Sequence, residues 1–156
     1  MINLSQIIPE GYCLQCMGCC RFAQERSAWA VRISSDEQQA LGIQDTIVPA
    51  QKNAETGQFV CSFFDLKKGR CTVYYKRPLE CQLYPFVINR KGSTLFLALD
   101  LNCPFARDNY ETQSMRDYIL NLAAACSSSG FLQYLKENPW LIQQYQDVLN
   151  VAALTK

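Results

Sequence analysis

The chain has 156 residues, of which 49% are hydrophobic and 19% are charged, and its net charge is +1. A chain of this length can bury one hydrophobic core, and this composition excludes a disordered protein. It has no run of about 18 apolar residues, so we expect no segment to span a membrane. Its N-terminus lacks the basic start and long apolar stretch of a signal peptide, which predicts a cytoplasmic protein with reduced thiols.

The small net charge hides an uneven distribution. Residues 61–107 carry eight basic and three acidic side chains, whereas acidic side chains are in excess elsewhere. This basic segment contains four cysteines, and nearby cations favour the thiolate over the thiol. A solvated loop face or a nucleic-acid patch would give the same excess. We favour local compensation of thiolates and do not expect the protein to bind nucleic acid.

The first third of the chain predicts short elements. Residues 1–27 are expected to form an irregular metal-binding segment, and the alternation of residues 29–33 predicts a short strand. Residues 34–42 have a complete helix signature. Ser34 and Glu37 can form a capping box at its start, and Gly42 suits its end.

The middle of the chain predicts a loop, a hairpin and a short helix. Residues 44–58 are polar and predict a surface loop. Residues 61–65 and 70–75 flank a turn with Gly69 at a position of positive φ, which predicts a β-hairpin. Pro78 is then expected to begin a short helix that ends before Pro85 and carries Cys81.

The last third predicts one strand and two helices. Leucines and a phenylalanine in residues 93–101 predict a strand that delivers Cys103 just past its end. Apolar residues at spacings of three and four predict a helix over about residues 111–127, ended by Gly130. A second helical stretch is expected from about residue 131, restarting at Pro139 and continuing to Ala152.

Eight of the nine cysteines form an ordered pattern, and the chain contains no histidine. Thiolate is a soft ligand that selects zinc, copper(I) or iron–sulfur clusters. An odd number of cysteines without an export signal favours metal ligands over disulfides. The candidate metal ligands are Cys13, Cys16, Cys19, Cys20, Cys61, Cys71, Cys81 and Cys103.

Two metal centres fit this pattern. Zinc held by four cysteines is a closed, structural site. An iron–sulfur cluster can also be held by four cysteines, and its ferredoxin form uses C-x2-C-x2-C with a further Cys-Pro, which Cys103-Pro104 resembles. We favour an iron–sulfur cluster over zinc. Cys19 and Cys20 can share one centre only if the backbone kinks; otherwise they serve two centres, or one is a free thiol.

Cys126 stands apart from the pattern. It lies on the apolar face of an alanine-rich predicted helix, where a free cysteine behaves as a small buried hydrophobic residue. We therefore assign Cys126 to the core and exclude it from the metal site.

The motifs resemble a known family. The run Cys13-x-x-Cys16-x-x-Cys19-Cys20, the segment 69–74 and the segment 77–85 are similar to the CxxCxxCC cysteine-cluster family of zinc- or iron-chelating domains. The resemblance covers about residues 13–104 and implies metal chelation by the eight cysteines. Gln82 and Tyr84 stand where the family often has arginine and phenylalanine.

Related cysteine motifs in flagellin lysine N-methylases imply an enzyme alternative, methyl transfer to protein lysine. Against it, the chain has seven glycines, no glycine-rich strand-to-helix turn for a nucleotide-type cofactor, and no histidine as a general base. We expect no catalytic residues. Arg77 and Glu80 are instead expected to form an ion pair that steadies the helix carrying Cys81.

The sequence therefore predicts a small single α+β domain over residues 1–156. Cysteine-rich loops and a β-hairpin in residues 13–104 would form the metal site, packed on C-terminal helices in residues 109–154. The predicted function is metal binding in redox or electron transfer, sensing or metal handling. The alternatives are a zinc-stabilised protein-interaction module and a subunit or relative of a cluster-containing protein lysine N-methylase. The expected partners are a metal and, for the interaction-module alternative, a protein; no membrane is expected.

Overall fold

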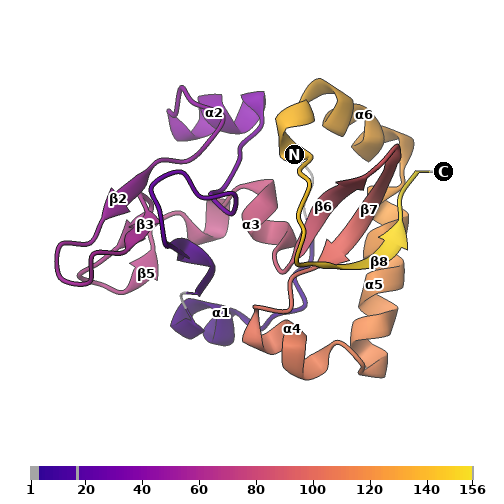
Figure 1. Cartoon of the computed structure of the whole chain (residues 1–156), viewed down its shortest axis with the longest axis horizontal. Helices are drawn as coiled ribbons and strands as arrows, with labels where there is room; N and C mark the ends of the chain where they lie inside the picture. The colour runs from indigo at the N-terminus through magenta and orange to yellow at the C-terminus, as the bar shows by residue number, and fades with distance from the viewer. Residues whose placement is uncertain (1–3, 17, 156) are drawn as a thin grey trace. The chain divides into compact units, whose positions relative to one another are not determined.

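The computed structural model describes residues 4–16 and 18–155, which divide into two compact units, Met1–Gln82 and Leu83–Lys156. Both units combine helices with antiparallel strands (Figure 1), so the chain has the predicted α+β class. No helix among the described residues has the length and apolar character needed to cross a membrane.

The first unit consists of short elements joined by loops. Its helices are α1 (Glu10–Cys16), α2 (Ser35–Leu41) and α3 (Leu79–Leu83), with 3-10 turns η1 (Gly18–Cys20) and η2 (Tyr74–Lys76); α3 ends at the boundary with the second unit. Its strands are β1 (Arg21–Phe22), β2 (Ala50–Lys52), β3 (Phe59–Cys61), β4 (Phe64–Asp65) and β5 (Arg70–Cys71).

Two small antiparallel sheets organise this unit. One has the strand order β1-β3-β2, and the other is the hairpin β4-β5. Strands this short cannot form a stable sheet unaided, so the buried side chains around them matter. The buried cluster consists of Phe22, Ile33, Val48, Cys61 and Phe64. One metal-ligand candidate, Cys61, thus also belongs to the hydrophobic core.

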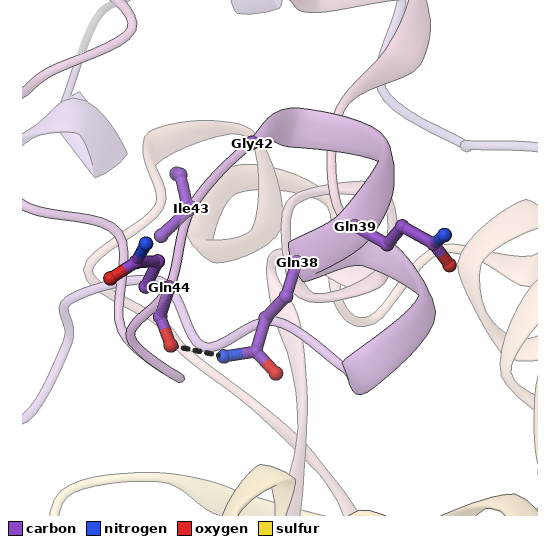
Figure 2. A pocket seen from close by; sticks show the side chains of 5 residues that line it. All are labelled: Gln38, Gln39, Gly42, Ile43 and Gln44. Carbon is purple, nitrogen blue, oxygen red and sulfur yellow. Dashed lines mark hydrogen bonds between the residues drawn. The ribbon is translucent and has the colours of Figure 1, made fainter.

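Helix α2 confirms the predicted helix signature. Ser34 accepts a hydrogen bond from the Glu37 backbone N–H at 3.2 Å, and the Glu37 carboxylate accepts one from the Ser34 backbone N–H at 2.8 Å. Gly42 ends the helix in the left-handed region at φ 68°. Beyond it, the Gln38 side chain donates to the Gln44 carbonyl oxygen at 2.9 Å beside an open surface hollow (Figure 2).

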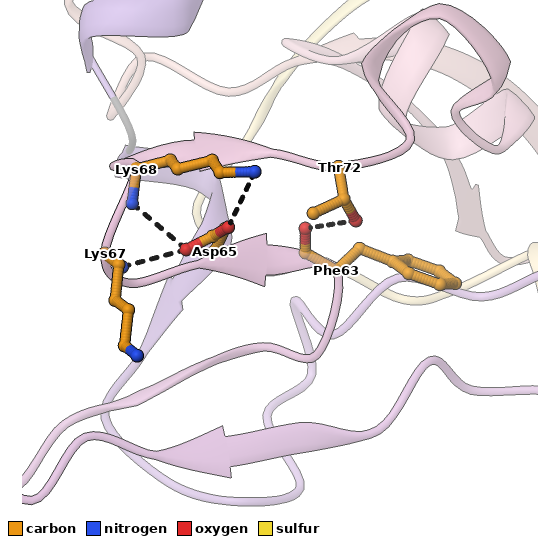
Figure 3. A network of polar contacts seen from close by, with 5 residues as sticks. All are labelled: Phe63, Asp65, Lys67, Lys68 and Thr72. Atoms are coloured by element: carbon orange, nitrogen blue, oxygen red, sulfur yellow. Dashed lines mark hydrogen bonds and ion pairs between the residues drawn. The ribbon is translucent and has the colours of Figure 1, made fainter.

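The hairpin turn between β4 and β5 is fixed by Asp65 (Figure 3). Its carboxylate accepts hydrogen bonds from the backbone N–H groups of Lys67 and Lys68, at 2.9 and 3.0 Å. These bonds lower the pKa of Asp65. Gly69 then adopts the predicted positive φ, at 63°. The turn places Cys71, at the end of β5, opposite Phe64.

Three predictions for the first unit need correction. Residues 29–33 form no strand, and only Arg32 makes a bridge, with Ile47. The loop predicted over residues 44–58 contains β2, whose polar sequence pairs with β3 because tertiary contacts override weak local preference. Residues 1–27, predicted to be irregular, contain α1, η1 and β1 within their described part.

The second unit is built around a sheet of longer strands. Its elements are β6 (Phe86–Lys91), β7 (Thr94–Leu99), α4 (Pro104–Asn109), α5 (Gln113–Cys126), α6 (Ser129–Glu137), η3 (Pro139–Leu141) and β8 (Leu149–Ala153). The strand order is β6-β7-β8, all antiparallel, and α5 packs against β8 (Figure 1). The predicted strand over 93–101 and the helix over 111–127 are both confirmed, as β7 and α5.

The end of the chain differs from the prediction. The helix predicted from residue 131 to Ala152 ends at Glu137, and residues 149–153 form strand β8. The prediction followed the helical spacing of apolar residues in this segment. The segment forms a strand instead, because it pairs with the free edge of β7. Gly130 lies inside α6 and does not end α5, which stops at Cys126 before Ser128 caps the next helix. Strand β6 was not predicted.

Candidate metal centre

The first unit gathers seven of the eight predicted ligands. Cys13 and Cys16 lie on α1, Cys19 and Cys20 on η1, and one cysteine each on β3, β5 and α3: Cys61, Cys71 and Cys81. Five separate elements therefore contribute thiols, which is how a metal site can tie together a unit of short strands and loops.

Backbone pairing explains part of this grouping. Strand β1 begins directly after Cys20, and its Arg21 pairs with Val60 of β3. In this antiparallel register the residue before Arg21 comes next to the residue after Val60, so Cys20 lies beside Cys61. Helix α1 contacts β5, which brings the Cys13–Cys16 turn toward Cys71.

Cys19 is the thiol that links the others. It raises the pKa of Cys13, Cys61 and Cys71 through charge repulsion, and it acts in the same way on Cys20 and Cys81. Such coupling requires these sulfur atoms to lie near one another. The adjacent pair has one shared environment, because Cys20 forms a hydrogen bond with Cys19 and interacts with Cys61 and Cys81. Both members of the pair therefore face the same group of thiols.

Burial is the larger cause of the raised pKa values at most of these thiols. It raises the pKa of Cys13 and of Cys61 to about 11, and it raises the pKa of Cys81 strongly. Crowded, desolvated thiols therefore stay protonated in the absence of a cation. A metal reverses this balance, because a coordinating thiol is deprotonated outright.

Hydrogen-bond donors already point at several of these sulfur atoms. The backbone N–H of Phe63 bonds Cys61 and that of Val73 bonds Cys71, in each case from two residues further along the chain. Tyr74 forms a side-chain hydrogen bond with Cys13. All three bonds lower the pKa of their cysteine, since a donor stabilises the thiolate. Donors to sulfur also tune iron–sulfur clusters and other thiolate centres.

The ion pair expected between Arg77 and Glu80 is not formed. Among the described residues, the ion pairs are Lys68–Asp65 and Arg107–Asp108. Arg77 turns toward Tyr74, where its carbon Cζ lies 4.2 Å from the ring centre, because the extended backbone before Pro78 directs it away from α3.

Two acidic side chains anchor α3 instead. The Glu80 carboxylate accepts the Arg32 backbone N–H at 2.6 Å, and the Glu37 carboxylate accepts the Leu79 backbone N–H at 2.6 Å. Burial raises the pKa of Glu80 to about 7, although the hydrogen bond from Arg32 opposes this shift. The helix that carries Cys81 is thus fixed to the loop around α2. The sequence signal was the capping-box Glu37, whose second carboxylate oxygen serves α3.

The remaining two cysteines lie in the second unit. Cys103 is buried at the N-cap of α4, four residues after the end of β7, so the prediction that this strand delivers it is confirmed. Its participation in the same centre stays a prediction. Cys126, at the end of α5, is fully buried, and burial raises its pKa to about 12. This environment agrees with the core role assigned from the sequence.

The chemistry of the donor set fits zinc or an iron–sulfur cluster. Seven thiols interact in one unit, and donors to sulfur are in place at three of them. No three cysteine or carboxylate side chains among the described residues are arranged as a ready-made metal site.

The surface hollow beyond α2 does not compete with this region as a site. It is lined by Gln38, Gln39, Gly42, Ile43 and Gln44 (Figure 2), which offer neither a thiol nor a charged side chain. It is also wide open to solvent, whereas ligand sites are concave and enclose most of their ligand.

Comparison with known proteins agrees with the cysteine pattern. A family model described as CxxCxxCC, "Putative zinc- or iron-chelating domain", matches residues 12–117, which is more than half of the chain. Searches of curated proteins and of solved structures gave no significant match.

Proposed function

Since the chain belongs to the CxxCxxCC family of zinc- or iron-chelating domains, we propose that it binds an iron–sulfur cluster or zinc through its eight patterned cysteines. The grouping around Cys19 is the observation that carries this proposal. The Cys19 thiol raises the pKa of five other thiols, and these five lie on five different elements. A core of ordinary packing does not need so many thiols at one place.

The donors to sulfur support a thiolate role. Backbone N–H groups directed at Cys61 and Cys71 stabilise a charge that a neutral thiol does not have. A cysteine used only for packing gains little from such a bond, because S–H and sulfur are weak hydrogen-bonding groups. The same cysteines lie in the segment matched by the family model.

Between the two metals, we favour the iron–sulfur cluster. The run C-x2-C-x2-C and the later Cys103-Pro104 resemble ferredoxin ligation, and hydrogen bonds to sulfur adjust the potential of such clusters. A bound cluster would supply one-electron chemistry. The thiols would bind it, and the aromatic residues beside them would limit access of water. The biological role would then be electron transfer, redox sensing or metal handling.

The first experiment identifies the metal. Protein purified without oxygen should contain iron together with acid-labile sulfide and should absorb in the visible range. Colourless protein with stoichiometric zinc would favour the zinc-stabilised interaction module. Protein that contains neither metal and takes up neither on reconstitution would contradict the proposal.

Cysteine variants identify the ligands. Cys13→Ser, Cys16→Ser, Cys71→Ser and Cys81→Ser should each lower metal content, because serine is a poor ligand for a soft metal. Cys126→Ala is the matched control and should leave metal content unchanged, since this thiol lies in the core of the second unit. Unchanged metal content in all four serine variants would show that these cysteines are not ligands.

A further inference from the structure

Arg77 is a cation beside two of the elements that carry cysteines. Its guanidinium donates to the carbonyl oxygen of Tyr74, three residues after Cys71, and Tyr75 of the same turn donates to Glu10 at the start of α1, which carries Cys13. A four-thiolate site with one divalent metal carries a formal charge of about −2, so a fixed cation beside two ligands would stabilise the bound state.

The guanidinium is held in place by three contacts. Nη1 donates to the Tyr74 carbonyl oxygen at 3.0 Å, and Nη2 donates to the side-chain oxygen of Gln6. The guanidinium carbon also lies 4.2 Å from the centre of the Tyr74 ring, a cation–π distance. These contacts restrain both terminal nitrogens. Tyr74 itself forms a hydrogen bond with Cys13, so the restraint extends to a candidate ligand.

The third nitrogen of the guanidinium group, Nε, differs from the two terminal nitrogens. Nε of Arg77 is the buried side-chain nitrogen or oxygen for which the described residues provide no hydrogen-bond partner. A buried donor without a partner destabilises the folded protein. Such a group therefore calls for an explanation, and an absent ion or ligand is one of the recognised ones.

We propose that Arg77 is a positioning residue of the metal centre, whose Nε–H donates to a ligand sulfur when metal is bound. The inference rests on the proposed metal function and deepens it. The contacts to Tyr74 and Gln6 hold the guanidinium, and the Nε–H is available for a thiolate of Cys13 or Cys71. Charge-assisted hydrogen bonds of this kind are about twice as strong as neutral ones.

The test uses Co(II) as a probe in the reduced 156-residue chain, with Arg77→Gln, Arg77→Lys and the control Arg70→Gln. Arg70 is an exposed cation next to Cys71, so its removal changes local charge without removing a buried donor. Loss of an outer-shell partner typically weakens metal binding about 10- to 100-fold. We expect that loss for Arg77→Gln at unchanged stoichiometry, and a change within about threefold for Arg70→Gln, since exposed charges are screened.

A second readout separates the hydrogen bond from a purely structural role. The sulfur-to-cobalt charge-transfer band should move to lower energy in Arg77→Gln, because a sulfur that has lost its donor gives up charge more easily. Arg77→Lys keeps the charge without an Nε–H at that place, so its band should shift while its affinity falls less than that of Arg77→Gln. If Arg77→Gln does not fold, Arg77→Lys alone decides the question.

The outcomes distinguish the two proposals. If the unaltered protein binds no Co(II) and takes up neither zinc nor an iron–sulfur cluster on reconstitution, the proposed metal function is wrong and this inference falls with it. If it binds Co(II) and the bands of both Arg77 variants stay in place, the metal function stands and the role of Arg77 is wrong. Equal loss of Co(II) affinity in Arg77→Gln and Arg70→Gln would show that Arg77 acts only as one of several nearby charges. This result would also overturn the inference.

Discussion

The cysteines of this chain differ in how far their thiols are buried. Cys16 is exposed, Cys61 is buried against phenylalanines, and Cys126 has no exposed surface at all. Thiolate is the reactive form of cysteine, and burial disfavours it. Reactivity should therefore separate the buried Cys126 from the exposed Cys16 once the metal has been removed.

Cys126 should be less reactive than Cys16 toward iodoacetamide at pH 8. Its pKa is raised by burial from 9.0 to about 12, so its thiol stays protonated at this pH. The same shift implies that its contribution to stability is complete below about pH 9 and is lost as the pH rises toward 12. Mass spectrometry of chelator-treated protein measures each site; labelling of Cys126 as fast as Cys16 would contradict its place in the core.

Secondary-structure elements of the first unit are too short to hold themselves together. Helix α2 has seven residues and α3 has five, whereas isolated helices are marginal below about 12–15 residues. Side-chain hydrogen bonds compensate. Glu37 joins the start of α2 to the start of α3, so the capping box also supports the helix that carries Cys81.

Ser34→Ala should therefore lower the free energy of unfolding by about 1 kcal/mol or more. Ser34 is buried, so its loss also leaves the Glu37 backbone N–H without its acceptor. Urea denaturation of the metal-loaded protein measures the change. Gln39→Ala, on the exposed face of the same helix, serves as the control and should change stability by less than about 0.5 kcal/mol. Equal effects in both variants would contradict the capping role.

The whole molecule contains two units with different sources of stability. The second unit has a sheet with two six-residue strands and a 14-residue helix that packs against β8. The first unit has strands of two or three residues and seven cysteines. Binding free energy of a structural metal acts as folding free energy, and we expect the first unit to depend on it more.

Removal of the metal by a chelator should therefore raise hydrogen exchange mainly in residues 10–82. Strands β6 and β7 should keep their protection, because their pairing in the second unit does not involve the seven cysteines. Hydrogen exchange followed by mass spectrometry, with and without chelator, compares the two units directly. An equal loss of protection around α4 would indicate that Cys103 ligates the same metal and couples the units. No loss in either unit would contradict a structural contribution of the metal.

Local signals predicted several elements correctly. The capping box of α2, the turn glycine of the β4-β5 hairpin, the proline before α3 and the apolar stripe of α5 each depend on residues close in sequence. The hairpin carries Cys71 and α3 carries Cys81. For these two candidate ligands the sequence therefore predicted both the residue and the element on which it lies.

The errors occurred where distant pairing decides the conformation. Strand β8 has an apolar spacing that also suits a helix, and β2 has the polar residues of a loop. Each became a strand because a partner strand offered unpaired backbone groups. The predicted ion pair between Arg77 and Glu80 was also wrong. The Glu80 carboxylate instead accepts the backbone N–H of Arg32, which is distant in sequence, and the Arg77 guanidinium donates to the Tyr74 carbonyl oxygen.

The sequence by itself determined the chemistry of this protein: eight ordered cysteines, no histidine, and membership of a chelating family follow from residue types and their spacing. Only the tertiary structure decided which thiols meet, that Cys19 and Cys20 share one environment, and that Arg77 is left with an unpaired donor near Cys13 and Cys71. Spacing along a chain restricts ligand type, whereas proximity depends on strand pairing and buried hydrogen bonds between residues far apart in sequence.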